Sequence, residues 1–279
     1  MRPISLEPLT IMTVPAPEFV DIAADLGCAE VALWVNLPYP GLEAPLLSAH
    51  SALLPTTLQK LQSRGLGVPT TECFNLSATF DCAAAGPALD VAASLGARAV
   101  TAVFLDDIDP GLAERKFVEF CQAAGGRGLN ATIEFLTISP LASSLAKTLA
   151  FIEKTAQPNA RVTIDFLHLV RTGGTVEELA GLDPALIGHV QICDGPLRAP
   201  QDPLFEMGEN RMIPGTGEFP LVDFLRCIPP EIPIGVEVPR KEDADHGVSP
   251  FEIARRCVEA TKRILTIADG ATRQITAVA

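Results

Sequence analysis

The amino-acid sequence predicts a single-domain (β/α)8 TIM barrel that spans residues 1–279. Short β-branched runs alternate with amphipathic segments along the whole chain, and this alternation gives eight strands and eight helices. Because parallel strands need crossover connections, the pattern indicates a parallel sheet, either open and doubly wound or closed into a barrel. Eight units, no G-x-G-x-x-G motif after the first strand and polar residues at consecutive strand ends favour the closed barrel.

The first units of the barrel are expected in the N-terminal part of the chain. The first apolar run lies near Leu6–Val14. The first helix is expected at Pro17–Leu26, where apolar residues recur at helical spacing and Gly27 gives the stop. A second strand is expected at Glu30–Val35, followed by a helix around Thr56–Ser63.

The same rhythm predicts the other units. Strands are expected at Val68–Phe74, Ala99–Leu105, Ala131–Leu136, Arg161–Phe166, Gly188–Cys193 and Ile232–Val238. Helices are expected at Gly86–Leu95, Leu112–Ala124, Ser143–Thr155, Val176–Leu182, Pro220–Ile228 and Pro250–Ala268.

Composition and charge restrict the class of protein. Hydrophobic residues make up 48% of the chain, which argues against disorder, and no stretch reaches the ~18 consecutive apolar residues of a membrane span. The N-terminal segment predicts no signal peptide, and seven scattered cysteines without a C-x-x-C pair are typical of the reducing cytoplasm. A net charge of −13 disfavours nucleic acid and polyanionic substrates, although a local arginine pocket could override the overall charge for a polyanionic substrate. Homo-oligomerisation is left open.

Polar residues stand late in the last four apolar strands. Strand five reads NATIEFLT with Glu134, strand six RVTIDFLH with Asp165, strand seven GHVQICDG with Gln191, and strand eight PIGVEVPR with Glu237. Because the active site of a (β/α)8 barrel is built at the C-terminal ends of its strands, these four side chains are expected to meet there.

Three carboxylates and one amide cannot simply pack together, because mutual repulsion would raise the pKa values of the acids and destabilise the fold. A divalent metal resolves this conflict. Its expected ligands are Glu134, Asp165, Gln191 and Glu237. Oxygen ligands suit Mg²⁺ or Mn²⁺, with Co²⁺ and Zn²⁺ as alternatives. The competing interpretation is that Glu134 and Glu237 pair with basic residues across the barrel mouth.

These strand ends resemble the xylose-isomerase-like TIM barrels, which are also grouped with the family-two AP endonucleases. The superfamily includes ketose 3-epimerases, hydroxypyruvate isomerase, inosose dehydratase and dehydroshikimate dehydratase. Its pattern of Glu, Asp, usually His, and Glu on strands five to eight matches the positions of Glu134, Asp165, Gln191 and Glu237. The resemblance implies a metal at these positions, although Gln191 stands where the epimerases usually carry His.

Two further segments are similar to this family. DFLH (165–168) resembles the D-x-x-H motif, which implies that His168 binds a substrate oxygen. GENRMIPGTGEFP (208–220) resembles Gly-Glu-x-Arg followed by Pro-Gly-x-Gly, which implies that Arg211 contacts substrate oxygens and that Pro214, Gly215 and Gly217 form a turn before the seventh helix. Strand five lacks the epimerases' Glu-Pro-Leu-Asn, and four histidines are too few for the three-zinc site of the DNA repair members.

The function expected from this resemblance is a metal-dependent sugar or polyol isomerase or epimerase that acts through an enediolate. Glu134 and Glu237 are expected on opposite faces of the carbon next to the carbonyl, where one removes a proton and the other returns it. If the intermediate expels a β-hydroxyl instead, the same site is a dehydratase or lyase for a keto-glycoside, inosose or shikimate-like cyclic polyol. A non-catalytic barrel subunit is the third alternative, and Gln191 keeps it open.

Several other residues carry two interpretations each. His189 points the same way as Gln191 but deeper, so we expect a buried, hydrogen-bonded core histidine. Asp194 either binds substrate or caps the next turn, and Arg240 either pairs with a metal carboxylate or reaches the substrate. Cys193 is expected to be a packed thiol, with a reactive thiol as the alternative. The candidate wall residues after the early strands are Trp34, Tyr39, Glu72 and Phe74.

Overall fold

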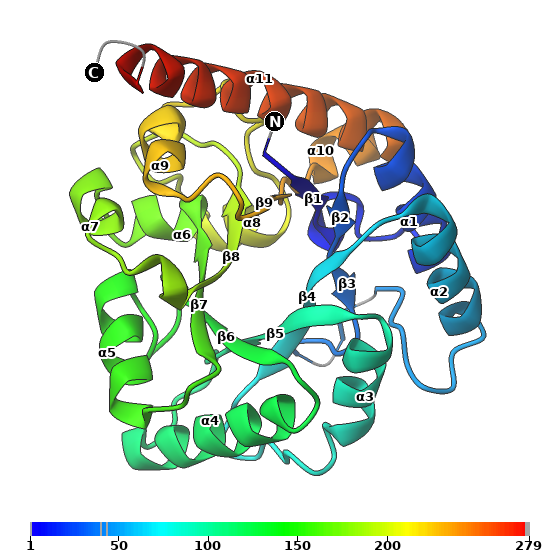
Figure 1. Cartoon of the computed structure of the whole chain (residues 1–279), viewed down its shortest axis with the longest axis vertical. Coiled ribbons are helices and arrows are strands. Elements are labelled where there is room, and N and C mark those ends of the chain that lie inside the picture. The colour runs from blue at the N-terminus through cyan, green and yellow to red at the C-terminus, as the bar shows by residue number, and fades with distance from the viewer. Residues whose placement is uncertain (1, 40, 43, 277–279) are drawn as a thin grey trace.

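The computed structural model describes residues 2–39, 41–42 and 44–276, and its parallel strands form a ring with helices packed on the outside (Figure 1). The strands are β1 (Ile4–Leu6), β2 (Glu30–Val31), β3 (Leu33–Trp34), β4 (Val68–Asn75), β5 (Ala97–Val103), β6 (Asn130–Glu134), β7 (Ala160–Asp165), β8 (Ile187–Ile192) and β9 (Ile234–Val236). Their order in the sheet is β2-β1-β9-β8-β7-β6-β5-β4-β3, which confirms the predicted barrel.

Most helices lie where the apolar spacing predicted them. They are α1 (Ala16–Asp25), α2 (Leu53–Arg64), α3 (Gly86–Ser94), α4 (Pro110–Gly125), α5 (Leu145–Thr155), α6 (Phe166–Arg171), α7 (Val176–Ala180), α8 (Pro203–Gly208), α9 (Leu221–Cys227), α10 (Lys241–Asp245) and α11 (Pro250–Thr276), with the 3-10 helices η1 (Pro8–Ile11) and η2 (Pro184–Leu186). Side-chain caps from Asp109, Ser144 and Thr175 fix the starts of α4, α5 and α7. Within the described residues, no helix is long and apolar enough to cross a membrane.

Two strand predictions were wrong in detail. The run Leu6–Val14 is not a strand beyond Leu6, because Pro8 has no backbone N–H for the sheet and instead opens η1. The predicted strand Glu30–Val35 is divided at Ala32 into β2 and β3. Since β2 pairs with β1 and β3 pairs with β4, this one stretch closes the barrel.

Three short helices were not predicted. They are α6, α8 and α10, and each lies in the segment after a late strand. These segments are too short, or too rich in polar residues, to show an amphipathic period. Two of them supply side chains to the barrel mouth, as described below.

The interior of the barrel contains a layer of threonine hydroxyls. The hydroxyl of Thr101 lies 2.8 Å from that of Thr70 and 3.1 Å from that of Thr132, which in turn lies 2.9 Å from that of Thr163. These fully buried residues come from the neighbouring strands β4 to β7. Because side chains alternate along a strand, residues two positions later point into the same interior.

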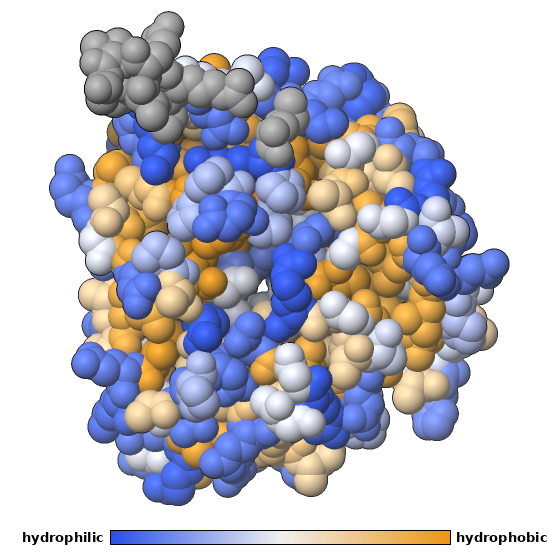
Figure 2. All heavy atoms as spheres, viewed as in Figure 1, coloured by the Kyte–Doolittle hydropathy of each residue, from blue (hydrophilic) through white to orange (hydrophobic). Residues whose placement is uncertain are grey.

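The hydrophobic core lies between the strands and the helices. Fully buried aromatic side chains fill this layer, among them Phe117, Phe120, Phe166 and Phe224. On the face seen in Figure 2, hydrophilic side chains project at the periphery and hydrophobic residues appear between them. The apolar side chains between the strands and the helices stabilise the ring, and polar side chains can therefore occupy the C-terminal end of its interior.

Candidate active site

The four residues predicted at strand ends all lie at the C-terminal end of the barrel. Glu134 and Asp165 are the last residues of β6 and β7. Gln191 is the second-last residue of β8, and Glu237 follows β9 directly. Glu134 and Asp165 stand two residues after the interior threonines of their strands, which explains why both side chains point inward. Asp165 and Gln191 are fully buried and Glu237 is 5% exposed.

Arg211 joins two of these acids. Its Nη1 atom donates to Asp165 Oδ2 at 2.7 Å and to Glu237 Oε2 at 2.9 Å, and the residue is 2% exposed. The backbone carbonyl of Met207 accepts from Nε and Nη2 and so fixes the other side of the guanidinium. Arg211 was expected to contact substrate oxygens; all three of its guanidinium nitrogens donate within the protein, and the substrate role stays a prediction.

Gln191 connects two acids through its amide nitrogen. Nε2 donates to Glu237 Oε1 at 2.9 Å and to Glu72 Oε1 at 3.3 Å. Its carbonyl oxygen, Oε1, is buried and accepts no hydrogen bond from the protein. A buried acceptor without a partner costs free energy, so this oxygen is suited to a group that the protein itself does not supply.

His168 belongs to the same cluster. It lies in α6, is 1% exposed, and its Nε2 atom is 3.6 Å from Glu134 Oε1 and 3.7 Å from Asp165 Oδ2. Burial lowers the pKa of His168 to about 4, so the ring is neutral near pH 7. The helix α6, capped by Asp165 through the backbone N–H of Leu167, carries His168 back over the barrel.

The buried acids do not have ordinary pKa values. The side chain of Glu134 is 12% exposed. Burial and then the charge of Asp165 raise the pKa of Glu134 to about 8. Burial raises the pKa of Glu237 and Glu72 well above the usual range, and Glu7 adds to the effect on Glu72. For Asp165 burial also acts upward, but Arg211 and His168 hold its pKa below the usual value. In the absence of a cation, the site therefore favours the protonated forms of Glu134, Glu237 and Glu72.

The donor set fits a divalent cation. Glu134, Asp165 and His168 each offer one ligand atom, and these atoms all lie within 4.8 Å of one another. The unpartnered Oε1 of Gln191 adds a neutral oxygen at the same end of the barrel. Glu237 is not one of these three residues; it is connected to them by Arg211, which pairs with both Asp165 and Glu237. The predicted ligand set and the geometric cluster thus share Glu134 and Asp165, and the metal roles of Gln191 and Glu237 stay predictions.

The remaining single residues have defined positions. Asp194 caps a turn: its carboxylate accepts from the backbone N–H of Gly195, Gly215, Gly217 and Phe219. Arg240 pairs with Asp243 and donates to the carbonyl of Arg211, so it reaches none of the acids at the strand ends. Cys193 is fully buried and burial raises its thiol pKa well above the usual range, as expected for a packed thiol.

Glu7 is a further buried acid of the site that the sequence did not single out. Glu7 follows β1, is fully buried, and its Oε1 lies 3.2 Å from His189 Nε2, while neither of its oxygens accepts a hydrogen bond. Gly235 makes room for it, because a Cβ there would lie 2.3 Å from that oxygen. The sequence did carry the signal: Ile-Ser-Leu-Glu is an apolar strand ended by an acid, the same pattern that identified the later strands.

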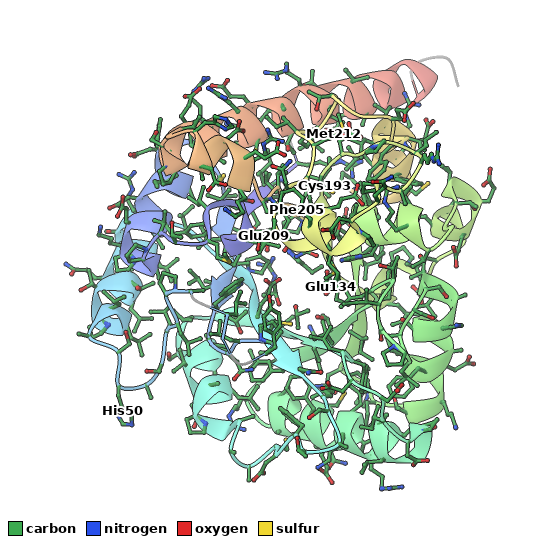
Figure 3. The ribbon with its side chains drawn as sticks, turned by 180° about the vertical axis from the view of Figure 1, so that it is seen from behind. His50, Glu134, Cys193, Phe205, Glu209 and Met212 are labelled. Atoms are coloured by element: carbon green, nitrogen blue, oxygen red, sulfur yellow. The ribbon has the colours of Figure 1, made fainter. Side chains whose placement is uncertain are left out.

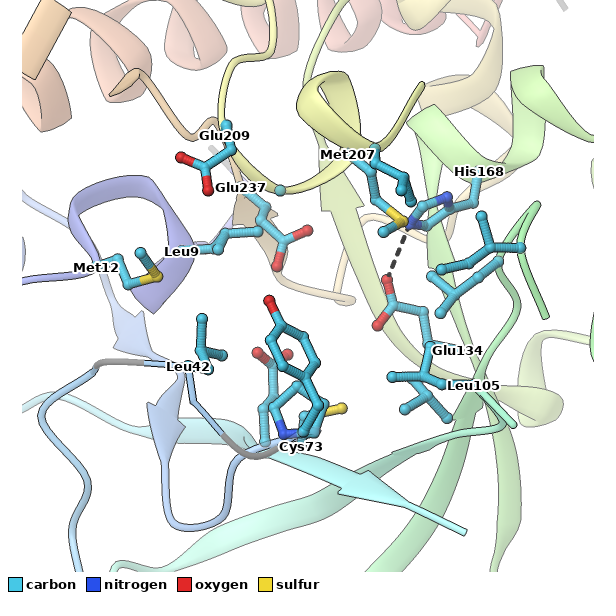
Figure 4. A pocket seen from close by; sticks show the side chains of 18 of the residues that line it. Leu9, Met12, Leu42, Cys73, Leu105, Glu134, His168, Met207, Glu209 and Glu237 are labelled. Atoms are coloured by element: carbon cyan, nitrogen blue, oxygen red, sulfur yellow. Dashed lines mark ion pairs between the residues drawn. The ribbon is translucent and has the colours of Figure 1, made fainter. Parts of the chain in front are cut away.

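The acids form the base of a cavity of about 630 Å³. Viewed from the side opposite to Figure 1, Glu134, Phe205 and Glu209 lie near the centre of the ring, whereas His50 lies at its periphery (Figure 3). The close view shows Leu9, Met12 and Leu42 on one side of the cavity (Figure 4). Trp34, Tyr39 and Glu72 line it as expected, but Phe74 does not, because its ring packs outward on Phe120 with the centroids 5.1 Å apart.

Comparison with known proteins gives a family model and several relatives. The model for the xylose isomerase-like TIM barrel matches residues 20–256. A Streptomyces coelicolor protein provisionally named hydroxypyruvate isomerase is 30% identical over 247 residues, which cover 76% of this chain and 80% of that protein.

Two solved structures share the fold. A fusion of a xylose isomerase-like TIM barrel with 4-hydroxyphenylpyruvate dioxygenase is 18% identical with a TM-score of 0.80; the match covers 99% of this chain, which spans 44% of the fusion's length. The IOLI protein with a binding zinc atom is 16% identical with a TM-score of 0.76, and the match covers 96% of this chain and 99% of that one.

Proposed function

Because the chain belongs to the xylose isomerase-like TIM barrel family, we propose that it is a divalent-metal-dependent isomerase or epimerase that moves a proton at a carbon next to a carbonyl. The observation that carries the proposal is the convergence of Glu134 and Glu237 at the base of the cavity. Burial raises the pKa of Glu134 to about 8, which suits a group that accepts and returns a proton near neutral pH, and it also raises the pKa of Glu237.

Each residue of the cluster has a part in this proposal. Glu134 removes or returns the proton on one face of the substrate carbon and Glu237 acts on the other. Arg211 orients Glu237 through the bond from Nη1 to Oε2, and its charge favours a substrate oxygen that becomes negative. Neutral His168 offers a nitrogen to a substrate oxygen or to the cation beside Glu134 and Asp165.

A divalent cation held by Glu134 and Asp165, with His168, Gln191 and Glu237 as further candidate ligands, would supply a Lewis acid for the carbonyl oxygen. Two findings support a cation: the clustered ligand atoms of this chain and the zinc atom of the IOLI structure, which shares the fold. The provisional name of the Streptomyces relative supports isomerisation as the reaction.

The proposal is tested with deuterium exchange. The purified protein, loaded with Mn²⁺ or Mg²⁺, is incubated in D2O with short hydroxy ketones and ketoses, among them hydroxypyruvate. We expect deuterium at the carbon next to the carbonyl and a product of otherwise unchanged mass. Loss of water from the product would establish the dehydratase alternative instead.

Variants then assign the acids. Glu237→Gln is expected to lower the exchange rate at least about 100-fold while circular dichroism and the melting temperature show an intact fold, because the proton carrier is lost. Glu231→Gln, which changes an exposed acid elsewhere, is the matched control. Full activity of Glu237→Gln, or full activity after chelation and dialysis, would refute the proposed mechanism.

A further inference from the structure

The walls of the cavity are largely apolar. Above the acids they are formed by aliphatic, sulfur-containing and aromatic side chains, among them Leu9, Met12, Leu105, Leu136 and Met207. The close view shows Leu105 opposite Leu9 and Met12, and Met207 beside His168 (Figure 4). The polar base and the apolar walls therefore form two zones of one cavity.

The walls offer few partners for hydroxyl groups. Among the described residues that line the cavity, none is a serine, threonine, asparagine, glutamine or lysine. A polyol chain that entered this zone would leave water and find few side chains to replace it, and each hydroxyl without a partner costs about 1–3 kcal/mol. The wall zone thus disfavours the hydroxylated tail of a long sugar.

The charges of the cavity also select against anions. Glu72, Glu134 and Glu237 lie at the base, and Asp202 and Glu209 line the cavity further out. The one cationic side chain among the described lining residues is Arg211, which is already paired with Asp165 and Glu237. A phosphate group on the tail of a substrate would be repelled by Asp202 and Glu209 and would meet no free guanidinium or ammonium group among the described lining residues.

The mouth of the cavity collects apolar side chains that are open to solvent. Eight large hydrophobic residues are exposed in the described chain, and four of them, Tyr39, Ile138, Leu204 and Phe205, line this cavity. Exposed apolar groups that gather at a mouth rather than scatter over the surface mark a binding surface. Their continuity with the walls extends the apolar zone from the base to the solvent.

Resting on the proposed function, we propose that the substrate is a neutral α-hydroxy carbonyl compound that carries an apolar tail, aromatic or aliphatic, in place of a sugar's hydroxylated chain. The hydroxy carbonyl head reaches the acids at the base. The tail lies against the leucine and methionine walls and leaves through the mouth beside Phe205. A cavity of about 630 Å³ accommodates both parts, in the usual size range for small-molecule sites.

The reaction of such a substrate balances without a further reactant. In a ketol, R–CO–CH2OH, one acid takes a proton from the hydroxymethyl carbon, the hydroxyl proton passes from the terminal oxygen to the former carbonyl oxygen, and a proton is returned to the former carbonyl carbon. The product is the isomeric hydroxy aldehyde, R–CH(OH)–CHO. One C–H bond and one O–H bond break, one of each forms, and no electrons leave the substrate.

Two ketols with the same head test the tail. They are hydroxyacetone, in which R is methyl, and 2-hydroxyacetophenone, in which R is phenyl. Calorimetry on the metal-loaded protein measures both dissociation constants, and proton NMR in D2O measures exchange of the hydroxymethyl protons. We expect at least about tenfold tighter binding of the phenyl compound, because its ring is removed from water. Equal affinities, or tighter binding of hydroxyacetone, would overturn the inference about the tail.

The wall is tested with a matched pair of variants. Phe205→Ser changes a mouth residue, and Phe251→Ser changes a similarly exposed phenylalanine that does not line the cavity. Phe205→Ser is expected to weaken 2-hydroxyacetophenone at least about threefold and to leave hydroxyacetone unchanged, while Phe251→Ser changes neither. Loss of self-association in Phe205→Ser without a change in either affinity would show that the mouth covers a second protein copy, and would overturn the inference.

The same experiment separates this inference from the proposed function. If 2-hydroxyacetophenone binds more tightly than hydroxyacetone but neither exchanges protons, the tail site stands and the proton-transfer function fails. If both exchange protons with equal dissociation constants, the function stands and the tail site fails.

Discussion

At the scale of single residues, Arg211 decides how the acids of this barrel coexist. One of its nitrogens bonds to both Asp165 and Glu237, so a buried guanidinium does part of the work that the sequence analysis gave to a metal alone. The competing interpretation, in which acids pair with a basic residue, is thus correct for Glu237 and not for Glu134, which has no basic ion-pair partner other than neutral His168 in the described structure. Glu134 is therefore the acid that most needs a cation in order to be ionised near pH 7.

This imbalance predicts a pH-dependent stability of the metal-free protein. Burial raises the pKa of Glu134 from about 4.5 to about 8, so folding favours its protonated form. The stability that this proton contributes is complete below about pH 4.5 and is lost as the pH rises to about 8. Glu134→Gln, measured with EDTA present, should raise the melting temperature at pH 8 by roughly 2 °C or more beyond any gain at pH 5.

Two comparisons make this prediction specific. Glu231→Gln removes an exposed carboxylate and is expected to change the melting temperature equally at both pH values. If Glu134→Gln also acts equally at pH 5 and pH 8, the carboxyl of Glu134 is not destabilised by its surroundings, and its proposed role as a proton carrier loses support.

At the scale of elements, the segment between β8 and α9 positions Arg211 by means of one buried acid. Asp194 is 1% exposed and accepts four backbone hydrogen bonds of 2.8–3.1 Å from residues 195–219. Gly217 allows this close approach, because a Cβ there would lie 2.4 Å from Asp194 Oδ1. The Pro-Gly-x-Gly segment is thus a turn wrapped around a carboxylate, which favours capping over substrate binding for Asp194.

Removal of this carboxylate should destabilise the fold strongly. Asp194→Ala leaves four backbone N–H groups without their acceptor, and we expect a loss of at least about 3 kcal/mol in the free energy of unfolding by urea. Asp194→Asn keeps one acceptor oxygen and should lose less. Asp223→Ala removes an exposed acid from α9 and is expected to stay within about 0.5 kcal/mol of the parent. A cost for Asp194→Ala as small as that would contradict the proposed role.

At the scale of the whole molecule, closure of the sheet brings distant parts of the chain to one point. Glu72 of β4 and Gln191 of β8 are 119 residues apart and share a hydrogen bond across the barrel mouth. Ligand atoms that come from β6, β7 and α6 are correctly placed only when the ring is closed. A cation bound there therefore binds the folded chain and not the unfolded one.

This coupling predicts that divalent metal stabilises the entire barrel. At 100 times its dissociation constant, Mn²⁺ should add about 2.7 kcal/mol, which corresponds to a rise of roughly 5 °C in the melting temperature of a chain of this size. Differential scanning calorimetry with and without Mn²⁺ measures the shift. The double variant Glu134→Gln with Asp165→Asn should lose most of it, and a shift of unchanged size in that variant would place the cation elsewhere.

The local pattern of the sequence determined the architecture. Alternation of β-branched runs with helical spacing predicted the barrel, because both periods are set by the backbone and are visible over a few residues. Strand ends such as NATIE and RVTID predicted the inward acids for the same reason, because side chains alternate along a strand and these acids fall on the interior side. The predicted element boundaries were wrong where the sequence shows no period, as at η1 and at the division between β2 and β3.

The tertiary structure decided which of these side chains touch. That Arg211 pairs with Asp165 and Glu237, that Gln191 turns its nitrogen to Glu72 and Glu237, and that His168 returns over Glu134 depend on loop paths and on residues far apart in sequence. The apolar walls are also a tertiary property, because they collect side chains from η1, β5 and α8 that are unremarkable in their own segments. Sequence alone set which residues point inward; closure of the barrel set their partners, since contact energy depends on distance in space and not along the chain.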